Sequence, residues 1–377
     1  MQKKITFAPR FFCECMYQYK KIAVKVGSNV LTRNDGTLNI TRMSALVDQI
    51  ADLHKHGVSV VLISSGAVAA GRSEIKPDKK LDAVSARQLY SAVGQAKLIN
   101  RYYELFREHH IPCGQVLTMK ENFGTRGHYL NQKNCMEAML QNGVLPIVNE
   151  NDTVSVTELM FTDNDELSGL IASMMDMDAL IILSNVDGIY DGDPTAIGSN
   201  VIREISDSKR ETFSFVRTGK SQFGRGGMLT KCRIAQKVAD EGITVMIANG
   251  MRDNILTELL KEHSTAICTR FVPSPKTVSN VKKWIAHSEG FAKGEVFIND
   301  GAREALLRPD KATSVLLVGV TRIEGDFEKD DIVKILDSAG NQIGLGCAGY
   351  DSEKARTRIG KRSDKPLVHY DYLYLEG

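Results

Sequence analysis

The sequence predicts an α/β protein with an open, mostly parallel sheet that has helices on both faces, followed by a small β-rich domain. Between residues 21 and 250, short apolar runs alternate with longer segments of helical periodicity. The runs are apolar throughout, which is typical of strands buried on both faces of a parallel sheet. Beyond residue 280 the segments become short, β-like and separated by turns, which is typical of a small domain made mainly of strands.

Length, charge and cysteine usage limit the class of protein. The 377 residues are enough for two or three domains, and 48 basic and 46 acidic side chains leave a formal charge of +2. This balance argues against a broadly basic nucleic-acid binder, and no run of about 18 apolar residues is present that would span a membrane. The seven cysteines are scattered without a C-x-x-C pair, so we expect reduced thiols in a cytoplasmic protein rather than a metal ribbon.

The pattern divides the chain into four parts. Residues 1–20 are basic and aromatic but lack the apolar core of a signal peptide. We expect a flexible extension there, or an over-long start if Met16 is the true initiator. The α/β domain is expected over residues 21–272, a proline-containing linker over 273–280, and the β-rich domain over 281–377.

Helices in the α/β domain are indicated by apolar residues at spacings of three and four, and strands by short apolar runs that end at glycine or polar residues. Segment 40–57 shows the helical pattern most fully, with Gly57 at its end and apolar side chains at Met43, Leu46, Val47, Ile50 and Leu53. The expected elements, in order, are strand 21–27, helix 40–57, strand 58–64 leading into a small-residue helix start, helix Val84–Phe106, strand 111–119, helix Asn131–Asn142, strand 145–152, helix Glu166–Met175, strand 179–190, helix Leu229–Glu241 and strand 243–250.

Polar motifs follow the apolar strands. The stretches KVGSN, SSGA, NEND, SNVDG and ANG each come directly after an apolar run. In open α/β sheets the ligand binds beyond the carboxyl ends of the strands. The sequence therefore predicts an enzyme whose site lies at that edge of the sheet.

Lys25 lies inside the first apolar strand. A buried lysine is unfavourable unless its ammonium group reaches an anion. Two interpretations stay open: a lysine of an edge strand that points to solvent, or a phosphate ligand at the strand end. In the second, Gly27 and the backbone N–H groups of Ser28 and Asn29 would approach the same anion.

Two helix starts are candidate anion sites, because free backbone N–H groups at a helix N-terminus bind phosphate or carboxylate. One is the strand-to-helix junction Ser64–Ala67, for which tight packing is the alternative. The other is the glycine-rich stretch Gly224–Gly227 before the helix that carries Lys231, for which a flexible loop is the alternative. Lys231 follows Thr230, so the stretch is not the Walker pattern.

Two acidic and amide clusters, NEND at 149–152 and TDND at 162–165, border apolar segments about a dozen residues apart. They are either solvated loops or a binding site. In the second interpretation Asp152 would bind an amino group, Asn164 would be an adaptable hydrogen-bonding partner, and Asp165 would orient cationic side chains. A paired-carboxylate glycosidase is also conceivable, but nothing else supports it. Two lysines, a glycine-rich helix start and acids at the strand ends together favour phosphoryl transfer, which depends on positioning and charge neutralisation.

Taken together, these motifs resemble the amino-acid kinase family. The matching stretches, in family order, are VKVGSNVLT, VVLISSGAVAAGR, AVGQAKLI, LPIVNENDTV, TDNDELSGLIA and GRGGMLTK. The tail, with WIAHSEGFAKGEVFINDGA and RIGKRSDKPLVHYDYLYL, resembles the PUA domain that many members append. The resemblance runs from about Lys21 to the end. It implies transfer of the γ-phosphate of ATP to the side-chain carboxylate of L-glutamate, the first committed step towards proline.

The resemblance also implies roles for individual residues. Lys25 and Lys231 would stabilise the charge on the transferring phosphoryl group, and Asp165 would hold both lysines in place. Glutamate would be bound by Ser65, Asp152 and Asn164. The nucleotide would be bound by Lys25, Ser184, Asn185, Arg225, Gly226, Gly227, Met228, Leu229, Thr230 and Lys231. Mg²⁺ would arrive with ATP, and no metal ligands are assigned to the protein.

Two positions depart from the family pattern. Many members have a Thr-Asp pair in the nucleotide site where this chain has Ser184 and Asn185, so a hydroxyl is kept but a charge is lost. Many members also have a small polar residue at Arg225. The resemblance further implies feedback inhibition by proline and a dimeric or tetrameric assembly.

Two other interpretations remain. One is an enzyme of the same fold that acts on aspartate, carbamate, acetylglutamate or a nucleoside monophosphate, which the β-rich C-terminal domain disfavours. The other is an RNA-binding protein that uses this domain. Residues 281–377 carry 15 basic and 16 acidic side chains, which disfavours a strongly electrostatic grip on RNA. A basic run is the exception, and it consists of Lys354, Arg356, Arg358, Lys361, Arg362 and Lys365.

Overall fold

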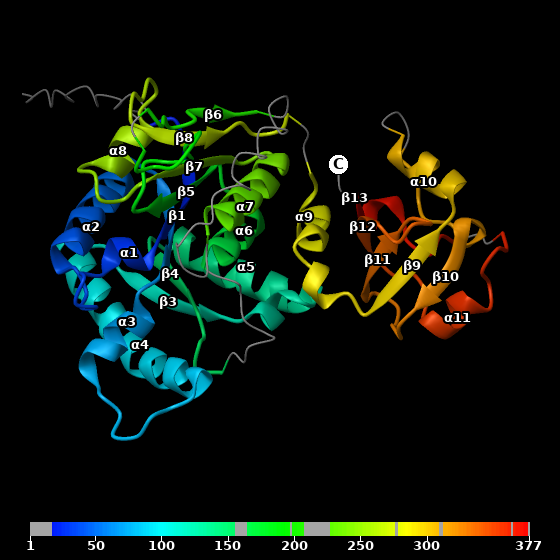
Figure 1. The fold of residues 1–377 in the computed structure, drawn as a ribbon, viewed down its shortest axis with the longest axis horizontal. Helices are drawn as coiled ribbons and strands as arrows, with labels where there is room; N and C mark the ends of the chain where they lie inside the picture. The colour runs from blue at the N-terminus through cyan, green and yellow to red at the C-terminus, as the bar shows by residue number, and fades with distance from the viewer. Residues whose placement is uncertain are drawn as a thin grey trace, which may run out of the picture.

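The computed structural model describes residues 17–154, 164–196, 198–206, 227–275, 278–308, 312–362 and 365–375. Within these residues, a large sheet has eight strands in the order β3-β4-β2-β1-β5-β7-β8-β6 (Figure 1). Neighbouring strands are parallel except β7 and β8, which are antiparallel. The strands are β1 (Lys21–Val26), β2 (Ser59–Ser64), β3 (Cys113–Thr118), β4 (Leu145–Glu150), β5 (Ala179–Ser184), β6 (Glu204–Ile205), β7 (Thr244–Asn249) and β8 (Cys268–Phe271). The mostly parallel sheet confirms the predicted fold class.

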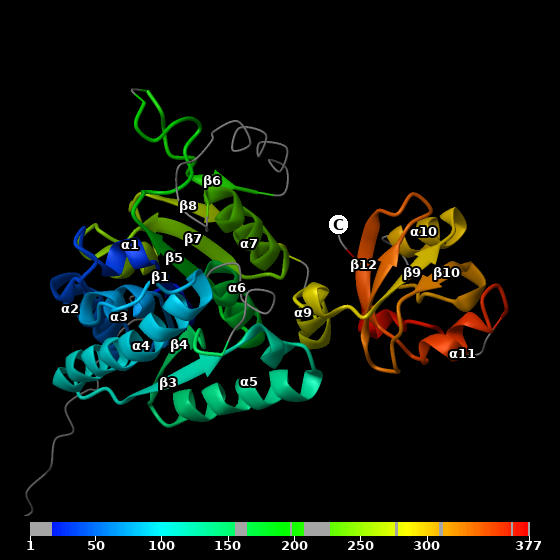
Figure 2. The same cartoon turned by 60° about the horizontal axis from the view of Figure 1, so that its bottom comes forward.

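Helices cover both faces of this sheet (Figure 1, Figure 2). One hydrophobic core joins the sheet to α2 (Ile40–Lys55), α3 (Ala67–Glu74), α4 (Ala83–Glu108) and α8 (Ile255–Leu260). The other core joins its opposite face to α5 (Arg126–Gln141), α6 (Asn164–Met174) and α7 (Met228–Asp240). The short helix α1 (Ser28–Leu31) follows β1, and a 3₁₀ turn, η1 (Lys120–Phe123), follows β3.

The alternation of side chains along β1 decides which face Lys25 occupies. Ile22, Val24 and Val26 pack into the core with α2 and α4, whereas Ala23 packs into the core with α6 and α7. Successive side chains of a strand point to opposite faces, so Lys25 lies on the same face as Ala23. Its ammonium group is therefore directed towards the starts of α6 and α7.

Helices α3 and α4 contact each other through their backbones at two glycines. A Cβ atom placed on Gly71 would lie 1.8 Å from the carbonyl oxygen of Tyr90, and one on Gly94 would lie 1.8 Å from that of Ala67. No other residue fits at either position, because any side chain would displace the facing helix. The crossing fixes α4 close to the junction between β2 and α3.

The C-terminal part contains a second sheet, with the strand order β10-β9-β11-β12-β13 among its described residues. Its strands are β9 (Gly294–Ile298), β10 (Val320–Glu324), β11 (Ile332–Leu336), β12 (Gln342–Cys347) and β13 (Leu373–Leu375). Two helices not anticipated from the sequence accompany them, α10 (Asp300–Leu307) and α11 (Ser352–Arg356). Three 3₁₀ turns complete the part, η3 (Glu289–Phe291), η4 (Leu317–Gly319) and η5 (Tyr370–Tyr372). Val296, Val333 and Ile335 lie in its separate core.

Helix α9 (Asn280–Ala286) lies between the two sheets (Figure 1). Its Trp284 and Ile285 belong to the same core as α6 and α7, and this core also includes Ile332 and Leu345 of the small sheet. The indole N–H of Trp284 donates to the carbonyl oxygen of Phe123 at 2.9 Å. The segment that follows the predicted linker is thus packed against both parts of the chain.

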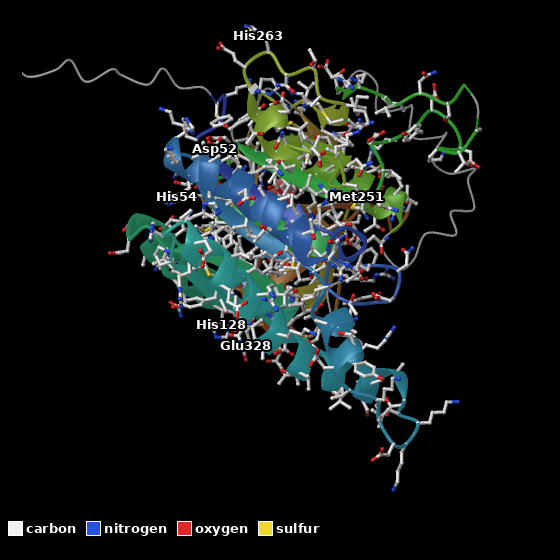
Figure 3. All side chains as sticks on the ribbon, turned by 90° about the vertical axis from the view of Figure 1, so that its left-hand side faces the viewer. Asp52, His54, His128, Met251, His263 and Glu328 are labelled. Carbon is white, nitrogen blue, oxygen red and sulfur yellow. The ribbon has the colours of Figure 1, made fainter. Side chains whose placement is uncertain are left out.

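An open pocket of about 510 Å³ lies on the flank formed by α2 and the segment that follows α4. Figure 3 shows this flank, with Asp52 and His54 on α2. Helix α2 leads into the beginning of β2, and α4 leads into the beginning of β3. The pocket therefore lies at the edge where the strands begin, opposite the edge where the polar motifs gather. Among the described residues, no helix is long and apolar enough to cross a membrane.

Candidate active site

The centre of the site is a carboxylate between two ammonium groups. Asp165 accepts from Lys25 Nζ at 2.6 Å through Oδ1, and from Lys231 Nζ at 2.8 Å through Oδ2. The three side chains are 1%, 7% and 14% exposed, respectively. Burial opposes ionisation of Asp165, but the two ammonium groups outweigh it and hold the pKa of this carboxyl below its usual range. The predicted catalytic residues are thus brought together in the ionised state.

Three elements deliver these groups to one point. Lys25 comes from β1, which lies in the middle of the sheet between β2 and β5, so it is not a lysine of an edge strand. Asp165 lies in the first turn of α6 and Lys231 in the first turn of α7. The positive end of the α6 dipole favours the carboxylate at that position. Gly27 lies beside Lys25, since a Cβ atom there would be 3.7 Å from Nζ.

Asn164 connects the ends of two strands, β2 and β4. Its amide nitrogen donates to Ser65 Oγ at 3.0 Å, to the carbonyl oxygen of Ser64 at 3.3 Å, and to Asn149 Oδ1 at 3.0 Å. Asn149 in turn donates to Gln95 Oε1 on α4 at 2.8 Å. Gln95 thereby fixes the orientation of the Asn149 amide, and the predicted substrate residues Ser65 and Asn164 are in direct contact.

The junction after β2 is a tight turn through Gly66. Gly66 caps α3 with φ of 105°, a left-handed conformation that favours glycine. A Cβ atom there would meet the side chains of Leu38 and Leu31 only at van der Waals distances, so the backbone angle rather than space requires the glycine. This turn exposes Ser65 at the carboxyl end of the sheet.

Asp152 is 8% exposed and contacts the same helix, α4, that carries Gln95. Arg87 of α4 donates to Asp152 Oδ1 from Nε at 2.8 Å and from Nη2 at 2.5 Å. The same Nη2 lies 3.2 Å from Glu150 Oε2. Ser91 donates weakly to Asp152 Oδ2, at 3.3 Å. The polar residues of the NEND motif are therefore structural and ionic partners of α4.

Sequence reasoning missed the contribution of α4. Arg87, Ser91, Gln95 and Tyr102 all reach the strand ends, the last through a 2.9 Å hydrogen bond between its hydroxyl and Ser64 Oγ. The first three recur every four residues, which places them on one helix face. This polar stripe on a buried helix face is the signal that would have identified them.

The structure describes some of the residues predicted to bind the nucleotide. Gly227 caps α7, whose first turn contains Met228, Leu229, Thr230 and Lys231. Arg225 and Gly226 lie outside the described residues. Ser184 is buried at the end of β5, and Asn185, next to it, is exposed. Ser184 Oγ and Asn185 Oδ1 are 3.4 Å apart, so the two residues form one polar surface at the strand end.

The SNVDG and ANG motifs meet through an ion pair that the sequence did not reveal. Arg252 donates to Asp187 Oδ1 from Nε at 2.6 Å and to Oδ2 from Nη2 at 2.8 Å. The hydrogen bond from Arg252 lowers the pKa of Asp187. This bidentate pair joins the segments that follow β5 and β7 beside Ser184.

Cysteine chemistry does not contribute at the site. The five cysteines in the described part of the chain are free thiols. Cys232 follows Lys231 directly, but burial raises the pKa of its thiol to about 12. It is therefore protonated at neutral pH and is not a nucleophile.

The basic run of the C-terminal part is engaged by neighbouring side chains. Lys354 and Arg358 both lie 5.5 Å from the centre of the Tyr350 ring, and Arg356 pairs with Asp326 at 3.0 Å. Cations over a ring are held by its negative face. These contacts give a structural role to three of the six basic residues of the run.

Comparison with known proteins agrees with this geometry. Residues 20–249 match the amino acid kinase family, and residues 294–370 match the PUA domain. The chain is 69% identical over 359 residues to a glutamate 5-kinase of Bacteroides thetaiotaomicron, covering 95% of this chain and 99% of that protein. It is 49% identical to a glutamate 5-kinase of Chlorobaculum tepidum, covering 95% and 98%. It is 38% identical to one of Thermoanaerobacter sp., covering 94% and 95%.

Proposed function

This chain belongs to the amino acid kinase family, in its glutamate 5-kinase branch with a PUA domain. It transfers the γ-phosphate of ATP to L-glutamate, and we propose the following roles for its residues in this reaction. The acceptor is the side-chain carboxylate, and the product is L-glutamyl 5-phosphate. The other acceptors considered from the sequence are set aside by the similarity to glutamate 5-kinases over nearly the whole chain. The observation that carries the roles is the Lys25–Asp165–Lys231 cluster at the carboxyl edge of the sheet.

Lys25 and Lys231 stabilise the transferring phosphoryl group. Negative charge on its oxygens must be neutralised as the bond to ADP breaks and the bond to the carboxylate forms. Asp165 binds one ammonium group with each of its two carboxylate oxygens, so both groups are preorganised for this task. Asp165 itself is a positioning residue, because both of its oxygens face lysines.

L-Glutamate is bound by Ser65, Asn164 and Asp152. The Ser65–Asn164 contact offers donors near Lys25, where the side-chain carboxylate must lie. Asp152 supplies the negative charge for the ammonium group of the substrate. ATP is bound by Ser184 and Asn185 at the end of β5, by the glycine-rich stretch with Arg225, Gly226 and Gly227, and by the first turn of α7.

Mg²⁺ is proposed to come with ATP. Among the described residues, no group of three or more His, Cys, Asp or Glu side chains is arranged to hold a metal ion. Both oxygens of Asp165 are engaged by lysines, so the donor set fits a metal held by the phosphates themselves. When bound, Mg²⁺ neutralises phosphate charge and orients the transferring group.

The remaining proposals concern the whole chain. We divide it into an extension at 1–20, a kinase domain at 21–272, a linker at 273–280 and a PUA-like domain at 281–377. We further propose a cytoplasmic enzyme that forms a homodimer or homotetramer and is inhibited by proline.

Replacement of Lys231 tests the catalytic assignment. We expect Lys231→Ala to lower kcat about 10²- to 10³-fold with a smaller change in KM for L-glutamate, because the lost charge acts mainly in the transition state. Hydroxylamine trapping of the acyl phosphate measures both constants. Arg233→Ala, an exposed position on the same helix, is the control. An unchanged kcat in Lys231→Ala would refute the assignment.

A further inference from the structure

Arg87 is the one cation that contacts the proposed substrate carboxylate Asp152 among the described residues. It also reaches Glu150, so one guanidinium group bridges two side chains that are 8% and 2% exposed. Arg87 itself is 35% exposed, because it lies near the start of α4 beside the open edge of the sheet. A charged group that is held by buried acids but remains open to solvent is suited to meet a ligand.

The guanidinium group of Arg87 uses only some of its hydrogen-bond donors in these contacts. Its Nε and Nη2 donate to Asp152 Oδ1, and Nη2 also faces Glu150. Its Nη1 has no partner among the residues that the structure describes. Within the described part of the chain, Asp152 Oδ2 accepts one long hydrogen bond, from Ser91. A free donor of Arg87 and a weakly used acceptor of Asp152 therefore belong to the same ion pair.

An α-amino acid carries complementary groups at the same spacing. Its ammonium and carboxylate are attached to one carbon, so their protein partners must lie within a few ångströms of each other. The free Nη1 of Arg87 can donate a charge-assisted hydrogen bond to such a carboxylate, and hydrogen bonds of this kind are stronger than those between neutral groups. Asp152 alone would bind any amine, and it would not distinguish an amino acid from an amine without the carboxylate.

We propose that Arg87 binds the α-carboxylate of L-glutamate while Asp152 binds its α-ammonium group, so that the pair selects the zwitterion. This inference rests on the proposed function and extends it to a specificity-determining residue. Glu150 balances the charge of Arg87 when the substrate occupies Asp152. The side-chain carboxylate of the substrate is then directed towards Lys25 and Lys231.

Two analogues separate this role from a merely structural one. 4-Aminobutyrate is glutamate without the α-carboxylate, and glutarate is glutamate without the α-ammonium group. Their inhibition constants against L-glutamate phosphorylation require no turnover of the analogue. In Arg87→Met, we expect the KM for L-glutamate and the inhibition constant of glutarate to rise about 10- to 100-fold, the range for a hydrogen bond to a charged group. The inhibition constant of 4-aminobutyrate should change less than about threefold.

Asp152→Asn should give the opposite pattern for the two analogues. It weakens L-glutamate and 4-aminobutyrate but leaves glutarate nearly unchanged. Arg101→Met is the matched control, because Arg101 lies on the same helix, is 39% exposed and pairs with Glu104 at 2.7 Å, about 20 Å further along the axis. It should leave all three constants as in the unaltered protein.

Removal of Arg87 also leaves two acids without their cation, so the variant must be shown to fold. Arg87→Lys keeps the charge but loses the fixed donor geometry of the guanidinium, and it should weaken binding of L-glutamate and glutarate by an intermediate factor at an unchanged melting temperature. Equal weakening of all three ligands, or of none, in both variants would overturn the proposal. If the unaltered enzyme phosphorylates glutamate but Asp152→Asn leaves its KM unchanged, the proposed role of Asp152 fails instead.

Discussion

Asp165 has one oxygen on each of two lysines, and this arrangement links its ionisation to the stability of the site. Its pKa is held below the usual carboxyl value by Lys25 and Lys231 despite burial. A group whose folded pKa is depressed contributes stability that is complete above its unfolded pKa, and this contribution is lost as pH falls through the folded pKa. The contribution is therefore constant at neutral pH and declines only below about pH 4, the ordinary carboxyl value.

The substitution Asp165→Asn tests this pH dependence. Loss of the carboxylate leaves two nearly buried ammonium groups without their counter-charge, and we expect the free energy of unfolding to fall by about 3 kcal/mol at pH 7. Below about pH 4 the carboxyl of the unfolded chain binds a proton more readily than the folded one, so this stabilisation declines and the difference should shrink at pH 3. Urea unfolding at both pH values measures this. A difference of equal size at both would show that the ion pairs are not its cause.

Individual residues of the candidate site were predictable where a local feature of the sequence marks them. Lys25, Asp165 and Lys231 are charged residues at a strand end or a helix start, and the sequence marks those places by composition. Arg87 and Gln95 lie inside α4, where their spacing marks one helix face but not what that face contacts. Which face of α4 meets the strand ends depends on how it crosses α3, a tertiary contact that sequence periodicity does not encode.

That crossing is the element on which the substrate side of the site depends. Gly71 and Gly94 allow the backbones of α3 and α4 to touch, and α3 begins directly after Ser65 and Gly66. Strands such as β2, β5 and β7 were predictable because their runs are largely apolar. The short elements β6, β8 and α9 are too brief for periodicity to indicate, and the order of strands in the sheet follows from packing rather than from sequence.

Gly94→Ala should separate α3 from α4. The added Cβ would lie 1.8 Å from the carbonyl oxygen of Ala67, so backbone must move, and we expect a loss of about 3 kcal/mol together with a higher KM for L-glutamate. Gly127→Ala on α5 is the matched control, since nothing lies within 4 Å of its Cβ position. There we expect no loss, or a gain of about 0.5 kcal/mol from reduced chain entropy. Equal effects of the two substitutions in urea unfolding would contradict the close contact.

At the scale of the molecule, α9 touches the far ends of the two helices that begin at the site. His287, just after α9, lies 3.0 Å from Glu241 Oε1 beyond α7 and 3.2 Å from Ser173 Oγ on α6. Lys283 of α9 pairs with Asp176 beyond α6 at 2.7 Å. Since α6 and α7 carry Asp165 and Lys231 at their other ends, two helices connect the junction with the small domain to the proposed catalytic cluster.

Trp284 is a fluorescence probe of this junction. It is the single tryptophan of the chain, it is 5% exposed, and it lies on α9. Its fluorescence therefore reports the junction alone, whereas far-ultraviolet circular dichroism reports both sheets. Because one core contains residues of α6, α7, α9 and the small sheet, we expect both signals to change in a single coincident transition in urea.

His287→Ala should split that transition. It leaves Glu241, which is 1% exposed, without its imidazole partner, and we expect a local cost of about 2–3 kcal/mol at the junction. Trp284 fluorescence should then change at lower urea than the circular dichroism, and kcat should fall because α6 and α7 lose their common support. His109→Ala is the control, since that histidine also pairs with a carboxylate, Asp48, at 2.8 Å but lies on the opposite flank and is 34% exposed. Coincident transitions in His287→Ala with an unchanged kcat would mean that the junction and the catalytic cluster are energetically independent.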